Sequence, residues 1–266
     1  MTVFLIVVIA FVLLLIFMAM PTFRRHPDRK LLEGLKIAHR GLHNAEIPEN
    51  SISAFLEAAA RGYGIENDIH ITADGEIVVF HDHTLDRMCG VSGRIEDITL
   101  AELKKLRLKD SDEQIPTLRE CLNAIDGRVP LLIEFKCDSV NCDRLCEAAN
   151  DILKNYKGKY FIQSFNPAVP TWYKHHRKDI LRGQLAMPYN GKNIVKHLAS
   201  SFLLNFGARP DFVAYDERAP KKLCFKLQKL LGALPVGWTF RSQKDLTDKN
   251  KLFKAYIFEG FIPDEN

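Results

Sequence analysis

Residues 64–82 read GIENDIHITADGEIVVFHD and contain two short apolar runs, Gly64–His70 and Ile77–His81, that each end in a histidine. The two-residue period of a β-strand places Glu66 and Asp68 on one face of the first run. Similar strand-like runs recur along the chain: Lys36–His39, Pro130–Lys136, Tyr160–Ser164, Leu181–Ala186, Phe212–Tyr215, Pro235–Thr239 and Ala255–Phe258. Between most of them, amphipathic segments predict helices: Ser51–Arg61, Thr117–Ile125, Asp143–Tyr156, Ala219–Leu231 and Gln243–Phe253. Eight or nine strands alternating with helices favour an α/β fold of the (β/α)8 TIM-barrel type over an open sheet.

The N-terminus differs in character from the rest of the chain. Val3–Met20 is an unbroken run of 18 apolar residues, the lower limit for a membrane-spanning helix. A basic group follows it: Arg24, Arg25, Arg29 and Lys30. A signal peptide usually has a basic start, whereas only Met1 and Thr2 precede this run, and a buried core helix is the third interpretation. We expect a transmembrane anchor at 1–22, a basic juxtamembrane linker at 23–34 and a catalytic barrel at 35–266, with the barrel on the cytoplasmic side of the cell membrane by the positive-inside bias.

Charge and cysteine content limit the partners and the compartment. The net charge is +4, but the basic group together with Asp28 supplies +3 of it, so no nucleic-acid-binding face is expected. A chain of this length buries a core without disulfides, so its six cysteines fit a reducing compartment. Cys137, Cys142 and Cys146 have a poor zinc-site spacing and are expected to be buried or incidental thiols.

Charged and titratable residues gather at the predicted strand ends, where a TIM barrel carries its chemistry. Glu66, Asp68 and Glu134 form a hard oxygen set that suits Mg²⁺ or Ca²⁺. Arg40 and Lys136 supply positive charge for a phosphate. His39 and His81 are proton carriers near neutral pH. The set predicts metal-assisted phosphoryl transfer; the alternative is that the carboxylates and Lys136 are salt-bridged side chains that fill polar barrel layers, with the histidines on solvated loops.

Several ordered motifs resemble the glycerophosphodiester phosphodiesterase family of the phospholipase-C-like phosphodiesterase superfamily. The N-terminal motifs are HRG at 39–41, PENS at 48–51, ExD at 66–68, TxDG at 72–75 and HDxxLxR at 81–87. Further motifs are IPTL at 115–118, IEFK at 133–136, QSF at 163–165, WT at 238–239 and GFIPD at 260–264. The chain departs from the family pattern at Ser51, Asn67, Arg241 and Pro263. The last two of these departures bear on the substrate pocket rather than on the phosphodiesterase chemistry.

The resemblance implies a TIM barrel that hydrolyses glycerophosphodiesters to glycerol 3-phosphate and an alcohol. It implies these site residues: His39 and His81 as the acid–base pair, Glu66, Asp68 and Glu134 as ligands of Mg²⁺ or Ca²⁺, and Arg40 and Lys136 on the phosphate. Glu49 is a further candidate ligand, or a partner of one. Phe165 and Trp238 are candidate walls of the substrate pocket, with core packing as the equal alternative. Two other functions stay open: lysophospholipase D-type hydrolysis of membrane lysophospholipids, and a barrel scaffold that has lost catalysis.

Overall fold

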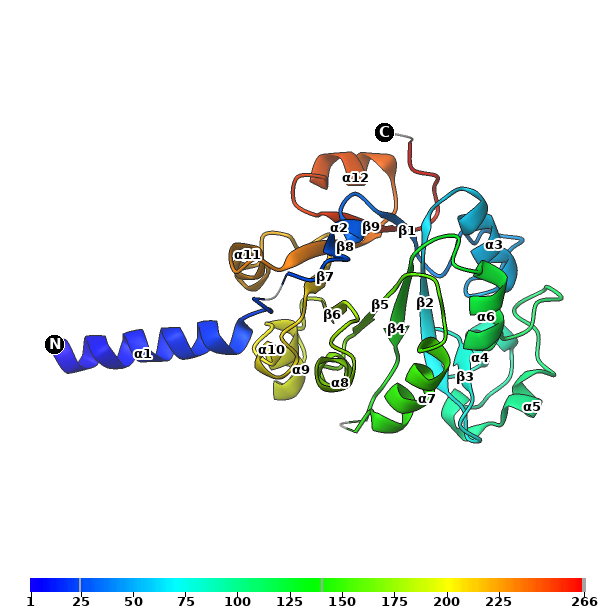
Figure 1. Cartoon of the computed structure of the whole chain (residues 1–266), viewed down its shortest axis with the longest axis horizontal. Coiled ribbons are helices and arrows are strands. Elements are labelled where there is room, and N and C mark those ends of the chain that lie inside the picture. Colours follow the sequence, from blue (N-terminus) through cyan, green and yellow to red (C-terminus); the bar gives the residue numbers. More distant parts are fainter. Residues whose placement is uncertain (24, 140, 265–266) are drawn as a thin grey trace.

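A computed structural model describes residues 1–23, 25–139 and 141–264. Eight parallel strands close into a barrel (Figure 1), each hydrogen-bonded to the next, with β1 and β2 completing the ring. In order around the ring they are β1 (Lys36–Ala38), β9 (Ala255–Phe258), β8 (Leu234–Phe240), β7 (Phe212–Asp216), β6 (Arg182–Ala186), β5 (Tyr160–Ser164), β4 (Leu131–Phe135) and β2 (Gly64–Ile71). One of the nine predicted strands is not part of the ring: β3 (Ile77–Val79) pairs antiparallel with the end of β2. The predicted TIM barrel is confirmed.

Helices surround the barrel: α3 (Ile52–Ala60), α6 (Leu118–Ile125), α7 (Asp143–Leu153), α8 (Ala168–His176), α9 (Ile194–Ser200), α10 (Asn205–Ala208), α11 (Leu223–Leu230) and α12 (Gln243–Lys249). Ser51 begins α3 as its N-cap, because its hydroxyl accepts a hydrogen bond from the Ala54 amide at 3.1 Å. Thr117 and Glu120 form a capping box that begins α6.

Strand alternation sorts side chains between two cores. In β4, Leu131, Ile133 and Phe135 belong to the core between the strands and the helices, whereas Leu132 belongs to a second core inside the barrel. Glu134 shares the inward face with Leu132, two residues along the strand. Apolar side chains therefore fill the barrel interior, and charged side chains follow them toward the carboxyl ends of the strands.

The segment expected as a linker packs against the N-terminal end of the barrel. It contains the short helix α2 (Arg29–Leu32), and Leu32 is fully buried in the inner core. His26 is buried with its Nε2 2.7 Å from the Asp179 carbonyl. The Arg29 guanidinium, expected to contribute to a basic surface, donates to the carbonyls of Asp211 and Gly232 at 3.2 and 2.7 Å. This segment thus plugs the end of the barrel opposite the strand carboxyl ends.

Helix α1 (Thr2–Ala19) projects from the side of the barrel that carries α10 and α11, away from α3 and α6 (Figure 1). It is long and apolar enough to cross a membrane, with mean hydropathy 3.3 and 6% of its length buried. Its C-terminal end is tied to the barrel: the Ala19 carbonyl accepts from Asn205 at 3.3 Å and from Gln228 at 2.7 Å. The barrel therefore holds the end of α1 by polar contacts to α10 and α11.

An insertion follows β3. It contains α4 (Asp86–Cys89), a 3-10 turn at Ile95–Asp97 and α5 (Leu100–Leu103). Its apolar side chains form a separate small core with Val78, Phe80 and Ile115. The insertion is thus a folded unit with its own buried residues.

Candidate active site

Three carboxylates meet where β2 and β4 run side by side. Asp68 and Glu134 are register partners across the two strands, and Glu66 lies two residues before Asp68 on the same face. All three are buried, and their oxygen atoms lie within 4.8 Å of one another. The structure therefore brings together the three residues predicted to bind a metal.

Two cations contact this group. Lys136 follows β4 and places its Nζ 2.9 Å from Asp68 Oδ1, while also donating to Glu134. Arg40 follows β1 in the left-handed region, with φ of 57°, so that its backbone amide donates to Glu66 Oε2 at 3.1 Å. Its guanidinium Nε lies 3.7 Å from Asp68 Oδ2. The predicted phosphate-binding residues are thus beside the carboxylates.

The charges in this cluster do not balance. Burial raises the pKa of Glu66 well above its usual range, and repulsion from Asp68 and Glu134 adds to the shift. Burial also raises the pKa of Glu134. For Asp68, burial acts in the same direction, but the neighbouring charges, of which Lys136 contributes most, together outweigh it and lower the pKa. Glu66 Oε1 is buried with no hydrogen-bond partner among the described residues. A buried oxygen without a donor, in a cluster of three carboxylates, fits a divalent cation.

Glu49, a candidate metal ligand or a partner of one, contacts two guanidinium groups beside the carboxylate cluster. Its carboxylate accepts from Arg40 at 2.7 Å and from both terminal nitrogens of Arg87 at 2.9 and 2.6 Å. Although burial opposes it, the hydrogen bond from Arg87 and the charge of Arg40 lower the pKa of Glu49 to about 2. Both oxygens of Glu49 are therefore engaged by guanidinium groups, and the residue orients Arg40.

Each of the two predicted acid–base histidines is paired with a carboxylate through Nδ1. His39 Nδ1 lies 2.7 Å from Glu259 Oε2, and His81 Nδ1 lies 2.7 Å from Asp82 Oδ1. Burial lowers the pKa of His39, although the hydrogen bond that the ring donates to Glu259 acts in the opposite direction. Burial likewise lowers the pKa of His81 to about 4. Both rings are therefore neutral at pH 7, and pairing at Nδ1 leaves Nε2 as the nitrogen for proton transfer.

Glu259 was not among the residues predicted from the sequence. It follows β9 directly, just as His39 follows β1, and the two strands pair with Ala38 opposite Phe258. Closure of the barrel thus brings together two residues that are 220 positions apart. Asn50 belongs to the PENS motif but was assigned no role in the site from the sequence; its side-chain amide donates to Asp68 Oδ2 at 2.9 Å.

The two aromatic residues proposed as pocket walls contact each other. Phe165 follows β5 and is 39% exposed, and its ring lies edge-on to that of Trp238 in β8, with the centroids 5.6 Å apart. The Trp238 indole nitrogen is buried without a hydrogen bond among the described residues. This pair forms an apolar surface at the strand ends on the β5–β8 side of the barrel.

A model of the glycerophosphoryl diester phosphodiesterase family matches residues 39–265. The chain belongs to this family. It is similar to glycerophosphodiester phosphodiesterase 1 of Homo sapiens, with 42% identity over an alignment of 311 positions that covers 96% of this chain and 86% of the human protein. A glycerophosphodiester phosphodiesterase of Caldanaerobacter subterraneus is 39% identical over 145 residues, which is 51% of this chain and 59% of that protein.

Solved structures of phosphodiesterases share the fold. A phosphodiesterase of Oleispira antarctica, in complex with the product sn-glycerol-3-phosphate, superposes with a TM-score of 0.71 at 22% identity, over 86% of this chain and 94% of that one. A glycerophosphodiester phosphodiesterase of Thermotoga maritima gives a TM-score of 0.67 at 23% identity, over 84% and 93%. At these identities the likeness concerns the barrel itself.

In this family member, a histidine–glutamate network ties the insertion to the site. The Nδ1 atom of buried His70 lies 2.9 Å from Glu96 Oε1, and that of His83 lies 3.4 Å from the same oxygen. The other ring nitrogen of His70 lies 3.4 Å from the His81 carbonyl. The insertion is therefore connected through His70 to the backbone of His81.

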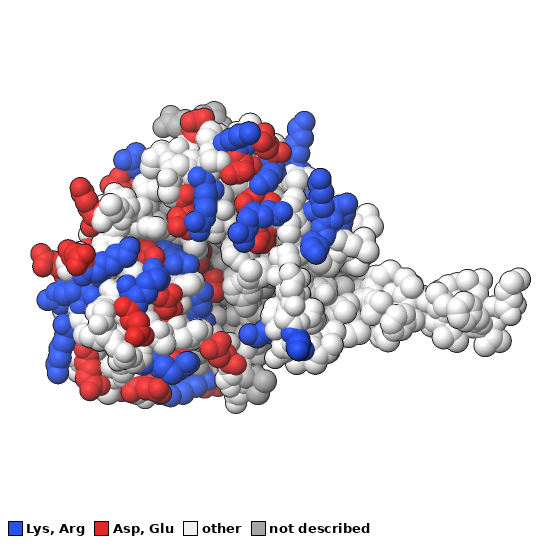
Figure 2. Space-filling model, turned by 180° about the vertical axis from the view of Figure 1, so that it is seen from behind, with Lys and Arg blue, Asp and Glu red and all other residues white. Residues whose placement is uncertain are grey.

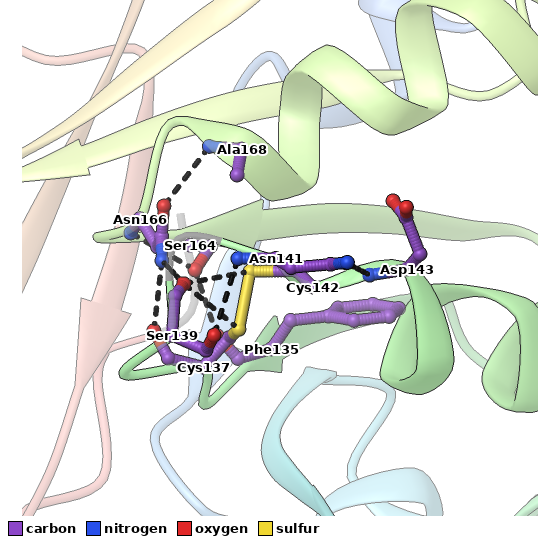
Figure 3. Close-up of a disulfide and its surroundings, with 9 residues drawn as sticks. All are labelled: Phe135, Cys137, Ser139, Asn141, Cys142, Asp143, Ser164, Asn166 and Ala168. Atoms are coloured by element: carbon purple, nitrogen blue, oxygen red, sulfur yellow. Dashed lines mark hydrogen bonds between the residues drawn. A yellow bond between two sulfur atoms is a disulfide. The ribbon is translucent and has the colours of Figure 1, made fainter.

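The loop after Lys136 contains a disulfide between Cys137 and Cys142 (Figure 3). The prediction that these were buried or incidental thiols is wrong for this pair, because the turn between β4 and α7 brings the two sulfur atoms together. Cys146 is a buried free thiol, as expected. The side chain of Asn166 donates to the carbonyls of Cys137 and Ser139 at 3.0 and 2.6 Å and holds this loop against the end of β5.

Proposed function

We propose that this chain hydrolyses glycerophosphodiesters to glycerol 3-phosphate and an alcohol with the help of a divalent metal. The observation that carries the proposal is a single cluster at the strand ends: three buried carboxylates, two cations and two histidines that are each paired with a carboxylate. The name of the human relative and the bound product of the Oleispira enzyme support the substrate class.

Glu66, Asp68 and Glu134 would hold the metal. Their oxygens suit Mg²⁺ or Ca²⁺, and Glu66 Oε1, which has no hydrogen bond among the described residues, would be one of the ligand atoms. When bound, such an ion polarises the phosphate oxygens and offsets their charge. It would also compensate the repulsion that raises the pKa of Glu66.

Arg40 and Lys136 would bind the phosphate. The Arg40 Nε is buried and has no hydrogen bond among the described residues, so a donor is available for a phosphate oxygen. The Nη1 atom of the same guanidinium donates a hydrogen bond to Glu49. Lys136 keeps its positive charge, because Asp68 and Glu134 raise its pKa against the effect of burial. Binding between these two cations would fix the phosphorus atom relative to both histidines.

His39 and His81 would carry the protons. A water molecule would attack the phosphorus atom, and one neutral ring would accept its proton at Nε2 as the new P–O bond forms. The other ring, once protonated beside the negatively charged phosphodiester, would deliver its Nε2 proton to the alkoxide that leaves as the second P–O bond breaks. Glu259 and Asp82 orient the rings through Nδ1 and stabilise the imidazolium that forms. Phe165 and Trp238 would pack against the organic part of the substrate.

We further propose that α1 crosses a membrane with the barrel on the cytoplasmic side. Its length and apolar surface support a span, and Arg25 and Lys30 follow it in accord with the positive-inside bias. The Cys137–Cys142 disulfide favours an oxidising compartment instead. Mass spectrometry of the tryptic peptide 137–144 from cells lysed in a thiol-blocking reagent tests the side. Two blocked thiols support the cytoplasm, and an intact disulfide supports the opposite face.

A membrane substrate is the second candidate. The apolar helix α1 would keep the barrel near lipids, and the lysophospholipase D GDPD1 of Rattus norvegicus is 31% identical over 47% of this chain. The test offers glycerophosphocholine and lysophosphatidylcholine at equal concentration, with Mg²⁺ and Ca²⁺ in turn. Faster release of glycerol 3-phosphate supports the first proposal. Faster release of lysophosphatidic acid establishes the second, and no product from either substrate indicates a scaffold without catalysis.

A further inference from the structure

A basic pocket lies at the N-terminal end of the barrel, beside the segment that follows α1. It has a volume of about 480 Å³ and is lined from three directions: by residues of the juxtamembrane segment, by the end of α11 with the start of β8, and by the turn before β9. Its charged lining residues are Arg25, Arg29, Glu33, Lys229, Lys251 and Lys254. Leu231, Leu234 and Leu252 contribute apolar surface.

Positive charge in this pocket is largely uncompensated. Five lining side chains are cationic and only Glu33 is anionic. Within the described part of the chain, none of the three lysine ammonium groups forms an ion pair with a carboxylate. Burial and the neighbouring charge of Lys254 lower the pKa of Lys229. Cations that destabilise one another in a shared hollow are typical of a site that binds an anion.

The pocket lies close to the point where α1 meets the barrel. Helix α1 ends at Ala19, and the lining residues Phe23 and Arg25 follow within six positions. Phe23 is 81% exposed, and Leu223 and Leu230 on the neighbouring α11 are also largely exposed. Figure 2, the view from behind, shows a projecting α1 without charged side chains and blue Lys and Arg side chains on the body of the molecule near its base. If α1 spans a bilayer, these apolar side chains lie at its surface and the pocket lies among the headgroups.

We infer that this pocket binds the phosphate headgroup of an anionic membrane lipid. The lysines and Arg25 would contact the phosphate, and the leucines would contact the glycerol portion. The pocket is distinct from the catalytic cluster, because it is built at the amino ends of β8 and β9 and in front of β1, whereas the three carboxylates lie toward the carboxyl ends of their strands. The inference rests on the proposed membrane location of α1.

The experiment compares the full chain in nanodiscs of phosphatidylcholine alone with nanodiscs that also contain phosphatidic acid. A lipid that binds the folded state stabilises it, so the unfolding midpoint of the wild type should rise by about 5 °C with phosphatidic acid. The variant Lys251→Gln/Lys254→Gln should lose at least half of this rise. Lys30→Gln is the matched control, because Lys30 belongs to the same basic segment as Arg25 but does not line the pocket.

Three results would overturn the inference: no rise for the wild type, an equal loss in the control variant, or the full rise with inorganic phosphate and no anionic lipid. The last would identify a site for a soluble phosphate. Carbonate extraction and glycerophosphocholine turnover are measured on the same preparation. Release of the chain by carbonate refutes the membrane anchor, and absent turnover refutes the enzyme. A membrane-held, active chain without the lipid effect refutes the pocket alone.

Discussion

Replacing Glu259 by glutamine tests whether pairing at Nδ1 gives His39 its function. Glutamine keeps the size and an acceptor oxygen of the side chain but removes the charge 2.7 Å from the ring. A hydrogen bond that involves a charged partner contributes about 1.5–3 kcal/mol, and about 1.4 kcal/mol corresponds to tenfold in rate. We therefore expect kcat to fall by about 10- to 100-fold with little change in KM, because in the proposed mechanism Glu259 orients the His39 ring rather than the substrate.

The same substitution changes the pH profile in a defined direction. In the wild type, burial lowers the pKa of His39 and Glu259 partly offsets the shift by stabilising the protonated ring. Without the carboxylate the pKa of His39 falls further. The limb of the kcat profile that His39 contributes should therefore move to lower pH, whether this ring gives or takes the proton. The assay is glycerol 3-phosphate release from glycerophosphocholine between pH 4 and 9.

Glu217→Gln is the matched control, since Glu217 also directly follows a barrel strand but pairs with Lys249 and not with a histidine. It should leave kcat within about twofold of the wild-type value. Thermal unfolding of both variants separates lost orientation from lost folding. A Glu259→Gln enzyme with normal kcat and an unmoved pH profile would refute the role of this pair.

Other substitutions test the two acid–base histidines, a buried amide in β2 and the segment that closes the N-terminal end of the barrel. His39→Ala and His81→Ala should each reduce turnover by about two to four decades while leaving the unfolding midpoint unchanged; near-normal activity in either variant removes that residue from the mechanism. Asn67→Leu should raise the free energy of unfolding by about 1–3 kcal/mol in urea, because both amide atoms of buried Asn67 lack hydrogen bonds among the described residues; a loss of stability would show that the amide has a partner. Leu32→Ala should cost about 2–5 kcal/mol in the same measurement, since Leu32 is fully buried in the inner core; a cost below about 0.5 kcal/mol would show that the segment does not plug the barrel.

The sequence predicted the barrel because eight or nine apolar, strand-like runs alternate with amphipathic segments along the chain. Leu132 and Glu134 point inward while Ile133 packs outward, and the same alternation places Glu66 and Asp68 inside. The carboxylate cluster was expected because residues at the carboxyl ends of barrel strands converge at one rim; the structure adds that β2 and β4 are direct neighbours. Local pattern was therefore sufficient for the fold and for the gathering of the three carboxylates.

Features that depend on long-range pairing were not predictable in this way. The contact between His39 and Glu259 arises only when β1 pairs with β9. The short helices α9 and α10 were missed because they have little buried apolar surface; Ile194 and Phe206 are exposed. Arg29 belongs to a cluster of basic residues for which the sequence predicts a solvated surface. Its hydrogen bonds to backbone carbonyls of the barrel were therefore not predicted.

The most direct test of the central claim measures glycerol 3-phosphate release from glycerophosphocholine by the full chain after complete chelation, and then during titration with Mg²⁺ or Ca²⁺. The account predicts no turnover in excess EDTA and recovery as either ion is added. It also predicts that Glu134→Gln requires more metal for half-maximal rate, because the variant lacks one of three charged oxygen ligands. Full turnover in excess EDTA, with the wild type and Glu134→Gln indistinguishable, would contradict the account.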